Sequence, residues 1–236
     1  MLASHGSHAG ERPNAAREGR KRWPDNALRA MMRHEQPNMT KSANALARTA
    51  YLAAAHTPQQ LPADDGREVV FAGRSNAGKS SALNTICNQN ALARTSKTPG
   101  RTQQLVFFEV VKGKYLVDLP GYGYAKVSKD LRAHWQGFLN DYFRTRMALC
   151  GIVVVMDIRH PLREFDLDML RFAADRGLPA HCLLTKCDKI GRGPQAQTLL
   201  AVRKQLPERA SAQVFSSETK QGVDEARAVV AGWLEV

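Results

Sequence analysis

Residues 73 to 80 read Gly73-Arg74-Ser75-Asn76-Ala77-Gly78-Lys79-Ser80, and they match the pattern G-x-x-x-x-G-K-[ST] at every fixed position. A short apolar run, Val69 to Ala72, precedes them, and a segment of helical composition from Ser81 to Gln89 follows. A strand, a glycine-rich turn and a helix start together direct backbone N–H groups toward phosphates. The pattern predicts a loop that binds a nucleoside triphosphate, with Lys79 at the β- and γ-phosphates and the Ser80 hydroxyl on Mg²⁺.

The composition is that of an ordinary soluble protein. The chain has 236 residues, 43% of them apolar and 24% charged, which suits one domain with extensions. No apolar run approaches the length of a membrane span, and the first residues lack the apolar segment of a signal peptide. Cys87, Cys150, Cys182 and Cys187 show no C-x-x-C spacing and are expected to be buried thiols. We therefore expect a cytoplasmic protein.

The formal net charge is +12, and most of it lies beyond the first 66 residues. Residues 1–66 hold 9 Lys and Arg against 6 Asp and Glu, whereas residues 67–236 hold 25 against 16. A basic folded domain favours a polyanionic partner, with nucleic acid as the first candidate. Charge alone leaves open a basic surface that has no partner.

The chain is expected to divide into three parts. Residues 1–43 are rich in Arg, His, Ala, Gly and Pro and show little periodicity, which predicts a basic, disordered extension with one short helix near 25–34. Residues 44–66 are expected to hold an N-terminal helix, within Ser42 to His56, and a proline-broken linker. Residues 67–236 are expected to form the nucleotide-binding domain.

From residue 67 onward, strand-like and helix-like segments alternate. Strands are predicted at 68–72, 105–111, 115–117, 151–156, 181–184 and 213–215, and helices at 81–89, 128–146, 162–176, 194–205 and 223–234. This order predicts an α/β fold with a six-stranded, mostly parallel sheet, one antiparallel edge strand, and helices on both faces. The aromatic stripe of the 128–146 helix is expected to pack in the core. Ligands of such folds bind at the carboxyl ends of the strands, where the motifs fall.

A second motif, Asp118-Leu119-Pro120-Gly121, follows the strand at 115–117. It is a D-x-x-G sequence, whose aspartate is expected in the Mg²⁺ shell and whose Gly121 N–H can meet the γ-phosphate. The Thr102 hydroxyl, in a basic loop, is a candidate second protein ligand of Mg²⁺ beside Ser80, because this cation takes oxygen ligands. D-x-x-G alone is a weak signal, and its place after a phosphate loop strengthens it.

A third motif, Thr185-Lys186-Cys187-Asp188, points to guanine. The Asp188 carboxylate can accept hydrogen bonds from guanine N1–H and the exocyclic amine, whereas adenine offers no donor at N1. The Lys186 stem is expected along the base plane, with its ammonium in water. Ser216 and Ser217, after the last strand, can direct backbone N–H groups to guanine O6. Alone, T-K-x-D also occurs in exposed polar turns.

The motifs together resemble one known family. Five segments are similar to the EngB (YihA/YsxC) family of bacterial GTPases: G-R-S-N-A-G-K-S-S at 73–81, S-K-T-P-G-R-T-Q at 96–103, D-L-P-G-Y-G-Y-A at 118–125, D-I-R-H-P-L at 157–162 and T-K-C-D at 185–188. The resemblance covers about residues 44–236. It implies a P-loop GTPase fold of the translation-factor-related class.

The resemblance also implies which residues form the site. The residues expected to bind the guanine nucleotide are Gly73, Arg74, Ser75, Asn76, Ala77, Gly78, Lys79, Ser80, Gly100, Arg101, Thr102, Gln103, Gln104, Asp118, Leu119, Pro120, Gly121, Thr185, Lys186, Cys187, Asp188, Phe215, Ser216 and Ser217. Mg²⁺ would be held by Ser80 and Thr102. Hydrolysis would depend on Lys79, Thr102 and Gly121.

The function that the resemblance implies is hydrolysis of GTP to GDP and phosphate, as a switch in assembly of the large (50S) ribosomal subunit. It also implies a requirement for normal cell division and septation. The expected partners are the large ribosomal subunit and its RNA, and we expect a monomer. Two alternatives stay open: a signalling GTPase that recruits a protein effector without RNA contact, and a non-enzymatic RNA-binding factor that holds nucleotide as a structural ligand.

Three further residues bear on the rate of hydrolysis. Many GTPases orient the attacking water with a glutamine after D-x-x-G, and Tyr122 occupies that position, so we expect slow intrinsic turnover that a partner raises. Asn76 resembles the asparagine of potassium-stimulated GTPases, which would make K⁺ an accelerating ion, or it hydrogen-bonds its own loop. Arg101 can serve as an arginine finger in cis or contact RNA. Residues 94–103 and 118–126 would be the switch segments.

Overall fold

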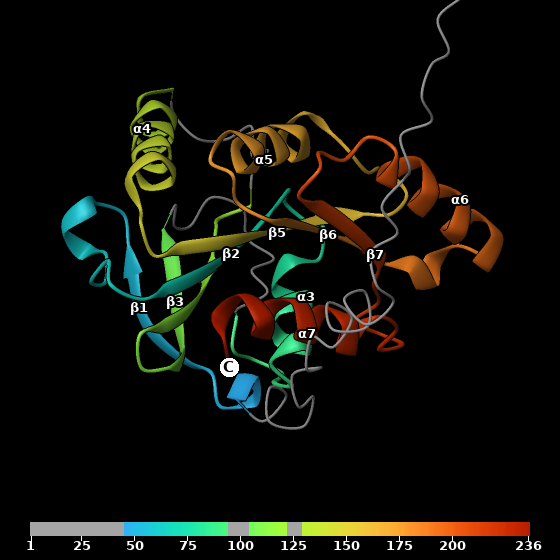
Figure 1. The fold of residues 1–236 in the computed structure, drawn as a ribbon, viewed down its shortest axis with the longest axis horizontal. Coiled ribbons are helices and arrows are strands. Elements are labelled where there is room, and N and C mark those ends of the chain that lie inside the picture. Colours follow the sequence, from blue (N-terminus) through green and yellow to red (C-terminus); the bar gives the residue numbers. More distant parts are fainter. Residues whose placement is uncertain (1–44, 94–103, 122–128) are drawn as a thin grey trace, which may run out of the picture. The chain divides into compact units, whose positions relative to one another are not determined.

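A seven-stranded sheet runs through the middle of the fold (Figure 1). The computed structural model describes residues 45–93, 104–121 and 129–236, with residues 129–136 described by backbone alone. The predictions for residues 1–43, 94–103 and 122–128 lie outside this part of the chain. All described residues belong to one unit, Pro37–Val236.

The elements follow the predicted alternation of strands and helices. The strands are β1 (Ala50–Ala55), β2 (Arg67–Gly73), β3 (Leu105–Val111), β4 (Lys114–Asp118), β5 (Leu149–Asp157), β6 (Ala180–Thr185) and β7 (Ala210–Val214). The helices are α3 (Lys79–Ile86), α4 (Lys129–Thr145), α5 (Glu164–Asp175), α6 (Arg192–Arg203) and α7 (Val223–Leu234), with 3₁₀ turns η1 (Pro58–Gln60) and η2 (Cys187–Lys189). Among the described residues, no helix combines the length and apolar character needed to cross a membrane.

The sheet is mostly parallel, which confirms the predicted α/β class. The strand order is β1-β3-β4-β2-β5-β6-β7. β3 runs antiparallel to both of its neighbours, β1 and β4, and the other four neighbouring pairs are parallel. The carboxyl ends of β2, β4, β5 and β6 therefore lie along one edge of the sheet, next to one another.

β1 is the main difference from the prediction. The sequence predicts a helix within Ser42 to His56, but the described chain is helical only at 45–47 and then forms the strand Ala50–Ala55. This strand makes the sheet seven-stranded in place of six-stranded, and it leaves the antiparallel strand β3 inside the sheet and not at its edge. Alanine favours helix, but pairing with β3 and the edge-to-face contact of Tyr51 with Phe108 outweigh that weak preference.

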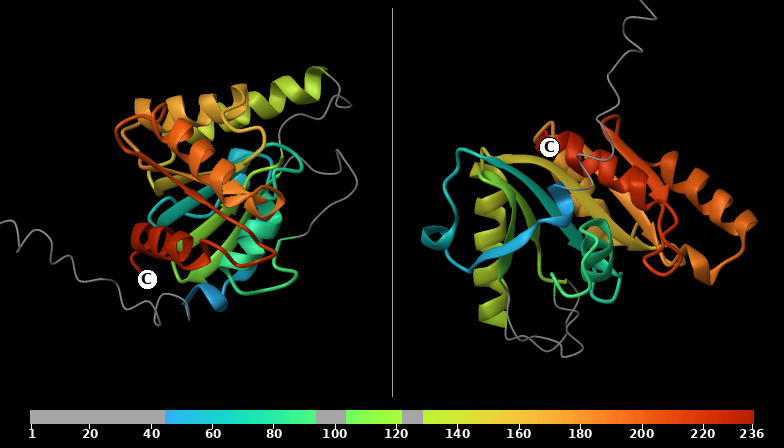
Figure 2. Two further views of the ribbon diagram at one scale, coloured as in Figure 1. Left: turned by 90° about the vertical axis from the view of Figure 1, so that its right-hand side faces the viewer. Right: turned by 90° about the horizontal axis from the view of Figure 1, so that it is seen from below.

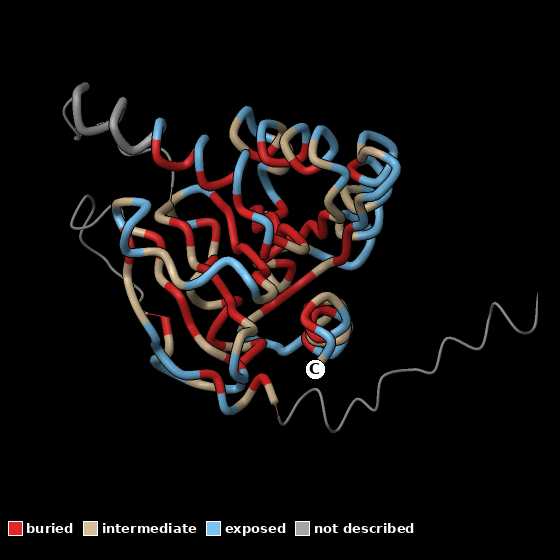
Figure 3. Tube along the Cα trace, turned by 60° about the vertical axis from the view of Figure 1, so that its left-hand side comes forward, coloured by how far each residue is buried: buried red, intermediate tan, exposed pale blue. Residues whose placement is uncertain are grey.

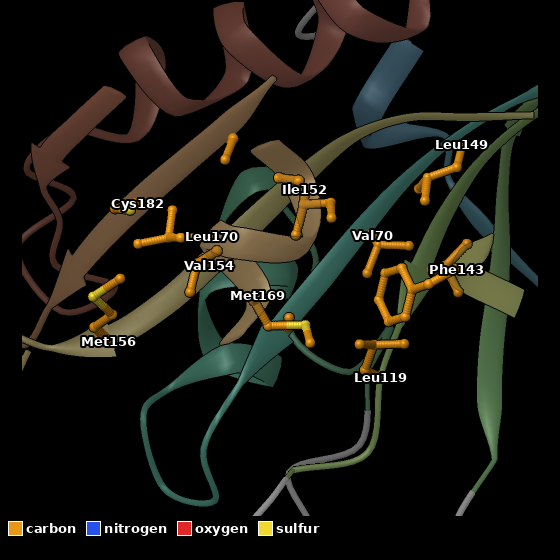
Figure 4. Packing of buried hydrophobic residues seen from close by; sticks show 14 of the residues in the cluster. Val70, Leu119, Phe143, Leu149, Ile152, Val154, Met156, Met169, Leu170 and Cys182 are labelled. Atoms are coloured by element: carbon orange, nitrogen blue, oxygen red, sulfur yellow. The ribbon is translucent and has the colours of Figure 1, made fainter. Parts of the chain in front are cut away.

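Alternate side chains of the central strands enter two separate cores. In β2, Val70 faces one core and Phe71 the other. The first core is covered by α4, α5 and α6 and the second by α3 and α7, so helices lie on both faces of the sheet (Figures 1 and 2). Figure 4 shows part of the first core, where Val70 and Val154 lie on the same side of the sheet as Leu170 of α5. The central strands are buried along almost their whole length (Figure 3).

Two predictions about buried side chains are confirmed in the described residues. Phe138, Leu139 and Tyr142, from the aromatic stripe of α4, are buried in the first core. The thiols of Cys87, Cys182 and Cys187 are also buried, and Cys150 is half-buried; all four are free. The stripe therefore serves packing, in keeping with the helical spacing of its members.

The carboxyl end of α4 is anchored by a buried ion pair. Glu68 at the start of β2 is fully buried, and Arg146, just after α4, is 5% exposed. The Arg146 guanidinium donates to both Glu68 oxygens, from Nε at 3.0 and 3.1 Å and from Nη2. The Tyr142 hydroxyl donates to Glu68 Oε2 at 2.7 Å, and burial, followed by the charge of Glu68, raises the pKa of Tyr142 well above its usual value. All the polar groups of this cluster therefore have partners.

A second arginine holds the same end of the helix. Arg176, the residue after α5, donates through Nη1 to the carbonyl oxygens of Phe143 and Arg144, and through Nη2 to Arg146 O at 3.2 Å. The Phe143 and Arg144 carbonyls belong to the last turn of α4, where carbonyls lack a donor within the helix, and Arg146 directly follows it. A cation at this position also complements the negative end of the helix dipole.

Asp166, in the first turn of α5, is a buried carboxylate with one unpartnered oxygen. It is 2% exposed; Oδ2 accepts the Arg163 N–H at 3.0 Å, and Oδ1 has no hydrogen bond among the described residues. Burial raises the pKa of Asp166 to about 6, against the opposing effects of the Arg163 N–H and the positive charge of Arg74 in the phosphate loop. The start of α5 therefore lies within electrostatic reach of the loop at 73–80.

Replacing Glu68 should destabilise the fold strongly. Glu68→Gln leaves the buried Arg146 charge with only the partly exposed Asp64 carboxylate, 3.4 Å from its Nε, so the free energy of unfolding should fall by about 3 kcal/mol. Asp168→Asn is the matched control, because it removes a carboxylate from an exposed pair with Arg171 and should cost less than about 1 kcal/mol. Guanidinium unfolding at pH 7 measures both variants, and equal small losses would contradict a role for the buried pair.

Replacing Asp166 should change how stability depends on pH. The pKa of Asp166 is higher in the folded chain, so its stabilising contribution is present below pH 4 and is lost as pH rises through about 6. The amide of Asp166→Asn does not titrate, so this variant does not lose stability in that pH range, and its side-chain oxygen can still accept the Arg163 N–H. Its free energy of unfolding relative to wild type should rise by roughly 2 kcal/mol between pH 4.5 and pH 7 in urea titrations. Parallel curves for the two proteins would rule this out, and Asp168→Asn again serves as control.

Candidate nucleotide-binding site

The predicted phosphate-binding loop connects β2 to α3. β2 ends at Gly73, and α3 begins at Lys79 after Gly78, whose φ is 93°. A side chain would strain this left-handed conformation, which explains glycine at this position. The Ala77 N–H closes the turn by donating to Arg74 O at 3.1 Å. The first N–H groups of α3, which have no acceptor within the helix, are then available for an anion.

An ion pair joins this loop to the D-x-x-G motif. Lys79 Nζ donates to Asp118 Oδ1, and the two side chains are only 8% and 14% exposed. Asp118 is the last residue of β4 and pairs with Phe71 of β2, the strand that carries the loop. Two motifs that lie 39 residues apart are therefore joined at the edge of the sheet.

The remainder of the D-x-x-G motif runs beside the phosphate loop. Leu119 is buried in the first core, and its N–H donates to Phe71 O at 3.0 Å; the half-buried Pro120 follows. A Cβ atom on Gly121 would lie 3.1 Å from the Ser75 Cα, which is closer than side chains normally approach backbone. A larger residue at Gly121 would therefore push the two loops apart.

The third motif also contacts the phosphate loop directly. The buried Thr185 hydroxyl lies within hydrogen-bond distance of Ala77 O and, at 2.9 Å, of Met156 O. The Lys186 ammonium donates to Asn76 O at 2.6 Å. The sequence predicts this ammonium in water; the structure adds a bond to backbone, because the loop carbonyls need donors. The Lys186 side chain is 33% exposed.

Asp188 is held by two donors. The Ser216 hydroxyl donates to Asp188 Oδ1 at 2.7 Å, and Lys189 Nζ contacts Oδ2 at 3.0 Å. The Ser216 hydrogen bond and then Lys189 keep the pKa of Asp188 below its usual value, so the carboxylate is ionised at neutral pH. The Ser216 oxygen in turn accepts the N–H groups of Glu218 and Thr219. An ionised, oriented acceptor is what recognition of two guanine donors needs.

One backbone donor proposed from the sequence is already used within the protein. The Ser216 N–H donates to Gln221 O at 3.0 Å, so it is not directed at a base. The Ser217 N–H makes no hydrogen bond within the described residues and is the one that suits guanine O6. Ser216 therefore contributes to the site through its hydroxyl, which orients Asp188, and not through its backbone N–H.

Three other predicted residues contribute no side chain to the site. Phe215 and Cys187 are fully buried in the second and first core. Their backbones join the two base loops, because the Cys187 N–H donates to Phe215 O at 3.3 Å. Gln104, just before β3, has its amide 3.5 Å from the His56 ring. Gly100, Arg101, Thr102, Gln103 and Tyr122 lie outside the described residues.

The residues present suit a magnesium ion held largely by phosphate oxygens and water. The Ser80 side chain, in the first turn of α3, is half-buried, and its hydroxyl has no partner among the described residues. The carboxylate of Asp118 lies at the neighbouring strand end. In the described part of the chain, no three His, Cys, Asp or Glu side chains gather as they would for a metal held by protein alone. Mg²⁺ fits such a sparse, oxygen-only donor set.

Sequence reasoning missed Asn84, which fixes the start of the basic loop. Its Oδ1 accepts the Ala93 N–H at 2.7 Å, and its Nδ2 donates to Ala93 O at 2.9 Å. Asn84 lies on α3, one turn after the phosphate loop, and is 7% exposed. A polar groove of about 440 Å³ borders this helix and the first turns of α7, with Ser81 in its lining. No sequence pattern marks such a contact, because an asparagine within a helix is most often exposed.

Sequence reasoning also left Asp157 and Arg159 without a role, although both lie in the D-I-R-H-P-L segment. Asp157 ends β5 and accepts two hydrogen bonds from the Arg159 guanidinium, at 2.9 and 2.6 Å. Lys186 Nζ lies 3.1 Å from Asp157 Oδ2. The side chains of the two loops that follow β5 and β6 thus meet beside the phosphate loop.

Comparison with known proteins also points to a guanine-nucleotide-binding site. Residues 68–186, half of the chain, match the family model described as "50S ribosome-binding GTPase". The chain is 65% identical over 188 residues to the GTP-binding protein EngB of Xanthomonas axonopodis pv. citri, covering 78% of this chain and 88% of that protein. It is 63% identical to EngB of Xylella fastidiosa over 78% of this chain and 93% of that protein.

Solved structures share the fold. A crystal structure of a GTP-binding protein EngB aligns with a TM-score of 0.57 and 19% identity, over 71% of this chain and 98% of that chain. The structure of Era in complex with MgGDPNP and nucleotides 1506–1542 of 16S ribosomal RNA aligns with a TM-score of 0.55 and 20% identity, over 71% of this chain and 56% of that chain. At these identities the likeness speaks for the fold alone.

The sequence identity to the EngB proteins is much higher than the identity to the solved structures. Identity of 65% extends over nearly the full length of a curated relative, and the family model begins at the strand that carries the phosphate loop and ends within the base motif. The chain therefore belongs to the EngB family of GTP-binding proteins, and it is a P-loop GTPase that binds GTP and GDP.

Proposed function

We propose that this GTPase acts as a nucleotide-dependent switch in the assembly of the large (50S) ribosomal subunit. The observation that carries the proposal is the match of residues 68–186 to a family of 50S ribosome-binding GTPases. The charge around the site supports it. Residues 158–163 and 189–192, which follow β5 and β6, contain four cations and no carboxylate.

The four cations are exposed where they can contact a polyanion, and two of them, Arg159 and Lys189, also pair with Asp157 and Asp188. They are Arg159, Arg163, Lys189 and Arg192. Contacts between such side chains and RNA phosphates release counterions, so binding of the subunit should weaken steeply with salt. A requirement for normal cell division and septation, and a cytoplasmic location, follow from the same family assignment as further parts of the proposal.

The hydrolysis itself is proposed to be an in-line attack by water on the γ-phosphorus. A bond forms from the water oxygen to phosphorus as the bond to the β–γ bridging oxygen breaks, which yields GDP and phosphate. Lys79 and the first N–H groups of α3 would stabilise the charge on the β- and γ-phosphate oxygens. The Gly121 N–H would bind the γ-phosphate. Mg²⁺, held by Ser80 and Thr102, would neutralise charge between the β- and γ-phosphates.

The rate is proposed to be low in the isolated protein. Tyr122 stands where many GTPases carry a glutamine, and a phenol cannot present the paired donor and acceptor of an amide to water. Asn76 is exposed, and its side chain makes no hydrogen bond within the described residues, so its amide oxygen is available to a K⁺ ion beside the phosphates. K⁺ is therefore proposed as an accelerating ion, and a ribosomal partner as the activator.

Guanine selectivity is proposed to come from Asp188, and exchanging it should exchange the preferred base. Asp188→Asn replaces an acceptor with a donor, which matches the carbonyl of xanthine in place of the guanine amine. GDP affinity should fall about 100-fold and XDP affinity should rise, because unpaired buried polar groups discriminate strongly. Competition against labelled nucleotide measures both values.

The control for this exchange is Lys189→Gln. It removes the other donor to Asp188 and keeps the carboxylate, so the preference for GDP over XDP should remain. If Asp188→Asn still prefers GDP, the assignment of the base site to Asp188 is wrong.

The ribosomal part of the proposal is tested by co-sedimentation with large subunits at several salt concentrations. We expect association with a GTP analogue, much less with GDP, and a steep decrease from 50 to about 200 mM salt. Asp188→Asn gives a matched control, since it should associate in an XTP analogue and not in the GTP analogue.

The other outcomes separate the remaining functions. Absence of association in every nucleotide would favour a signalling GTPase that recruits a protein effector. Equal association with GTP, GDP and no nucleotide would favour an RNA-binding factor that holds nucleotide only as a structural ligand.

A further inference from the structure

A charged cluster lies between the loops that follow β5, β6 and β2. Its centre is the Asp157 carboxylate, which is 16% exposed. Arg159 binds it through Nε at 2.9 Å and Nη2 at 2.6 Å, and the Arg159 backbone N–H donates to Oδ1 at 3.0 Å. The Lys186 ammonium approaches the other oxygen, Oδ2, at 3.1 Å. These donors lower the pKa of Asp157, with the Arg159 side chain as the largest cause.

The same ammonium also binds the phosphate loop. Lys186 Nζ donates to Asn76 O at 2.6 Å, so one lysine links Asp157 to the loop expected to hold the phosphates. The Lys186 backbone is left-handed, with φ 59°, a conformation that is costly for a residue with a side chain. Such a conformation persists where surrounding contacts hold it, and the two bonds of the ammonium are contacts of that kind.

The charges of the cluster depend on Asp157. Lys186 and Arg159 are both cations, and a single carboxylate lies between them, so the three groups carry a net charge of +1. The Asp157 carboxylate raises the pKa of the Arg159 guanidinium, with a smaller contribution from Asp188. Without the negative charge at Asp157, Lys186 and Arg159 would repel each other, and the Lys186 ammonium would lose one of its two contacts.

The cluster is not needed to hold the strands together. β5 and β6 are paired along their length up to Asp157 and Thr185, and the Ile158 N–H donates to Thr185 O at 3.0 Å beyond the last pair. These backbone contacts fix the strand ends. The side-chain contacts of Asp157 therefore act on the Lys186 side chain and on Arg159.

We propose that Asp157 is a positioning residue for guanine-nucleotide binding, which holds the Lys186 ammonium on the phosphate loop so that the lysine stem lines the base site. Arg159 braces the carboxylate through two hydrogen bonds. The inference rests on guanine binding at Thr185 to Asp188.

A double-mutant cycle on the full chain tests this role. The variants are Asp157→Asn, Lys186→Met and the double variant, with GDP affinity and the dissociation rate of a fluorescent GDP as readouts. Asp157→Asn should weaken GDP binding and speed its release about tenfold, within the range of coupling between contacting charges. In the Lys186→Met background, the same change should have almost no further effect, because Asp157 acts through that lysine.

A purely structural role would give a different pattern. If Asp157→Asn weakens GDP binding by the same factor with and without Lys186, or leaves binding unchanged in the wild-type background, the proposal is overturned. Arg159→Gln should weaken binding several-fold, in the same direction. Asp168→Asn is the control, since it also neutralises an arginine-paired carboxylate but lies on the exposed side of α5.

The outcome is separable from the ribosomal proposal. The binding assay contains no ribosome. If the double-mutant cycle shows the expected coupling of Asp157 and Lys186 but the protein fails to co-sediment with large subunits, only the role in subunit assembly is removed. Conversely, wild type that binds GDP tightly while Asp157→Asn binds equally well would remove only the inference about Asp157.

Discussion

The site depends on how the carbonyl groups of the phosphate loop are satisfied. In a planar trans peptide the N–H and C=O groups point in opposite directions, so a loop that turns N–H groups toward phosphate turns carbonyls away from it. Those carbonyls need donors, since unpaired buried backbone groups are costly. Thr185 and Lys186 supply them to Ala77 and Asn76. The loop at 185–188, proposed to read the base, therefore also supports the loop at 73–80, proposed to bind the phosphates, and the two cannot be positioned independently.

Most of the fold and the main loops could be predicted from the sequence, because their signals are local. Continuous apolar runs such as 151–156 are typical of buried parallel strands, and parallel strands place the loops that follow them at one edge of the sheet. The phosphate loop, D-x-x-G and T-K-x-D motifs are short enough to recognise directly. Lys79 with Asp118, and Asp188 with Ser216, lie together as that geometry requires.

The parts that could not be predicted depend on partners far away in the chain. Ala50–Ala55 has the composition of a helix, and it is a strand because β3 offers a place for pairing. Glu68 and Arg146 are 78 residues apart, so no local pattern links them. The Lys186 ammonium binds the backbone oxygen of Asn76, which lies 110 residues away in the sequence. In each case, a tertiary contact decided between states that the local sequence allowed.

The anchoring of α4 has a mechanical consequence. The carboxyl end of this 17-residue helix is held in place by two arginines. Arg146 binds Glu68, and Arg176 binds the carbonyls at the end of the helix. Core packing from Phe138 to Phe143 also holds the carboxyl half, and the eight residues before Gly137 span about 12 Å at a rise of 1.5 Å per residue. A tilt of roughly 10° about the packed half would carry the amino end by about 2 Å, so a displacement that reaches α4 would be expressed at that end and not at the anchored one.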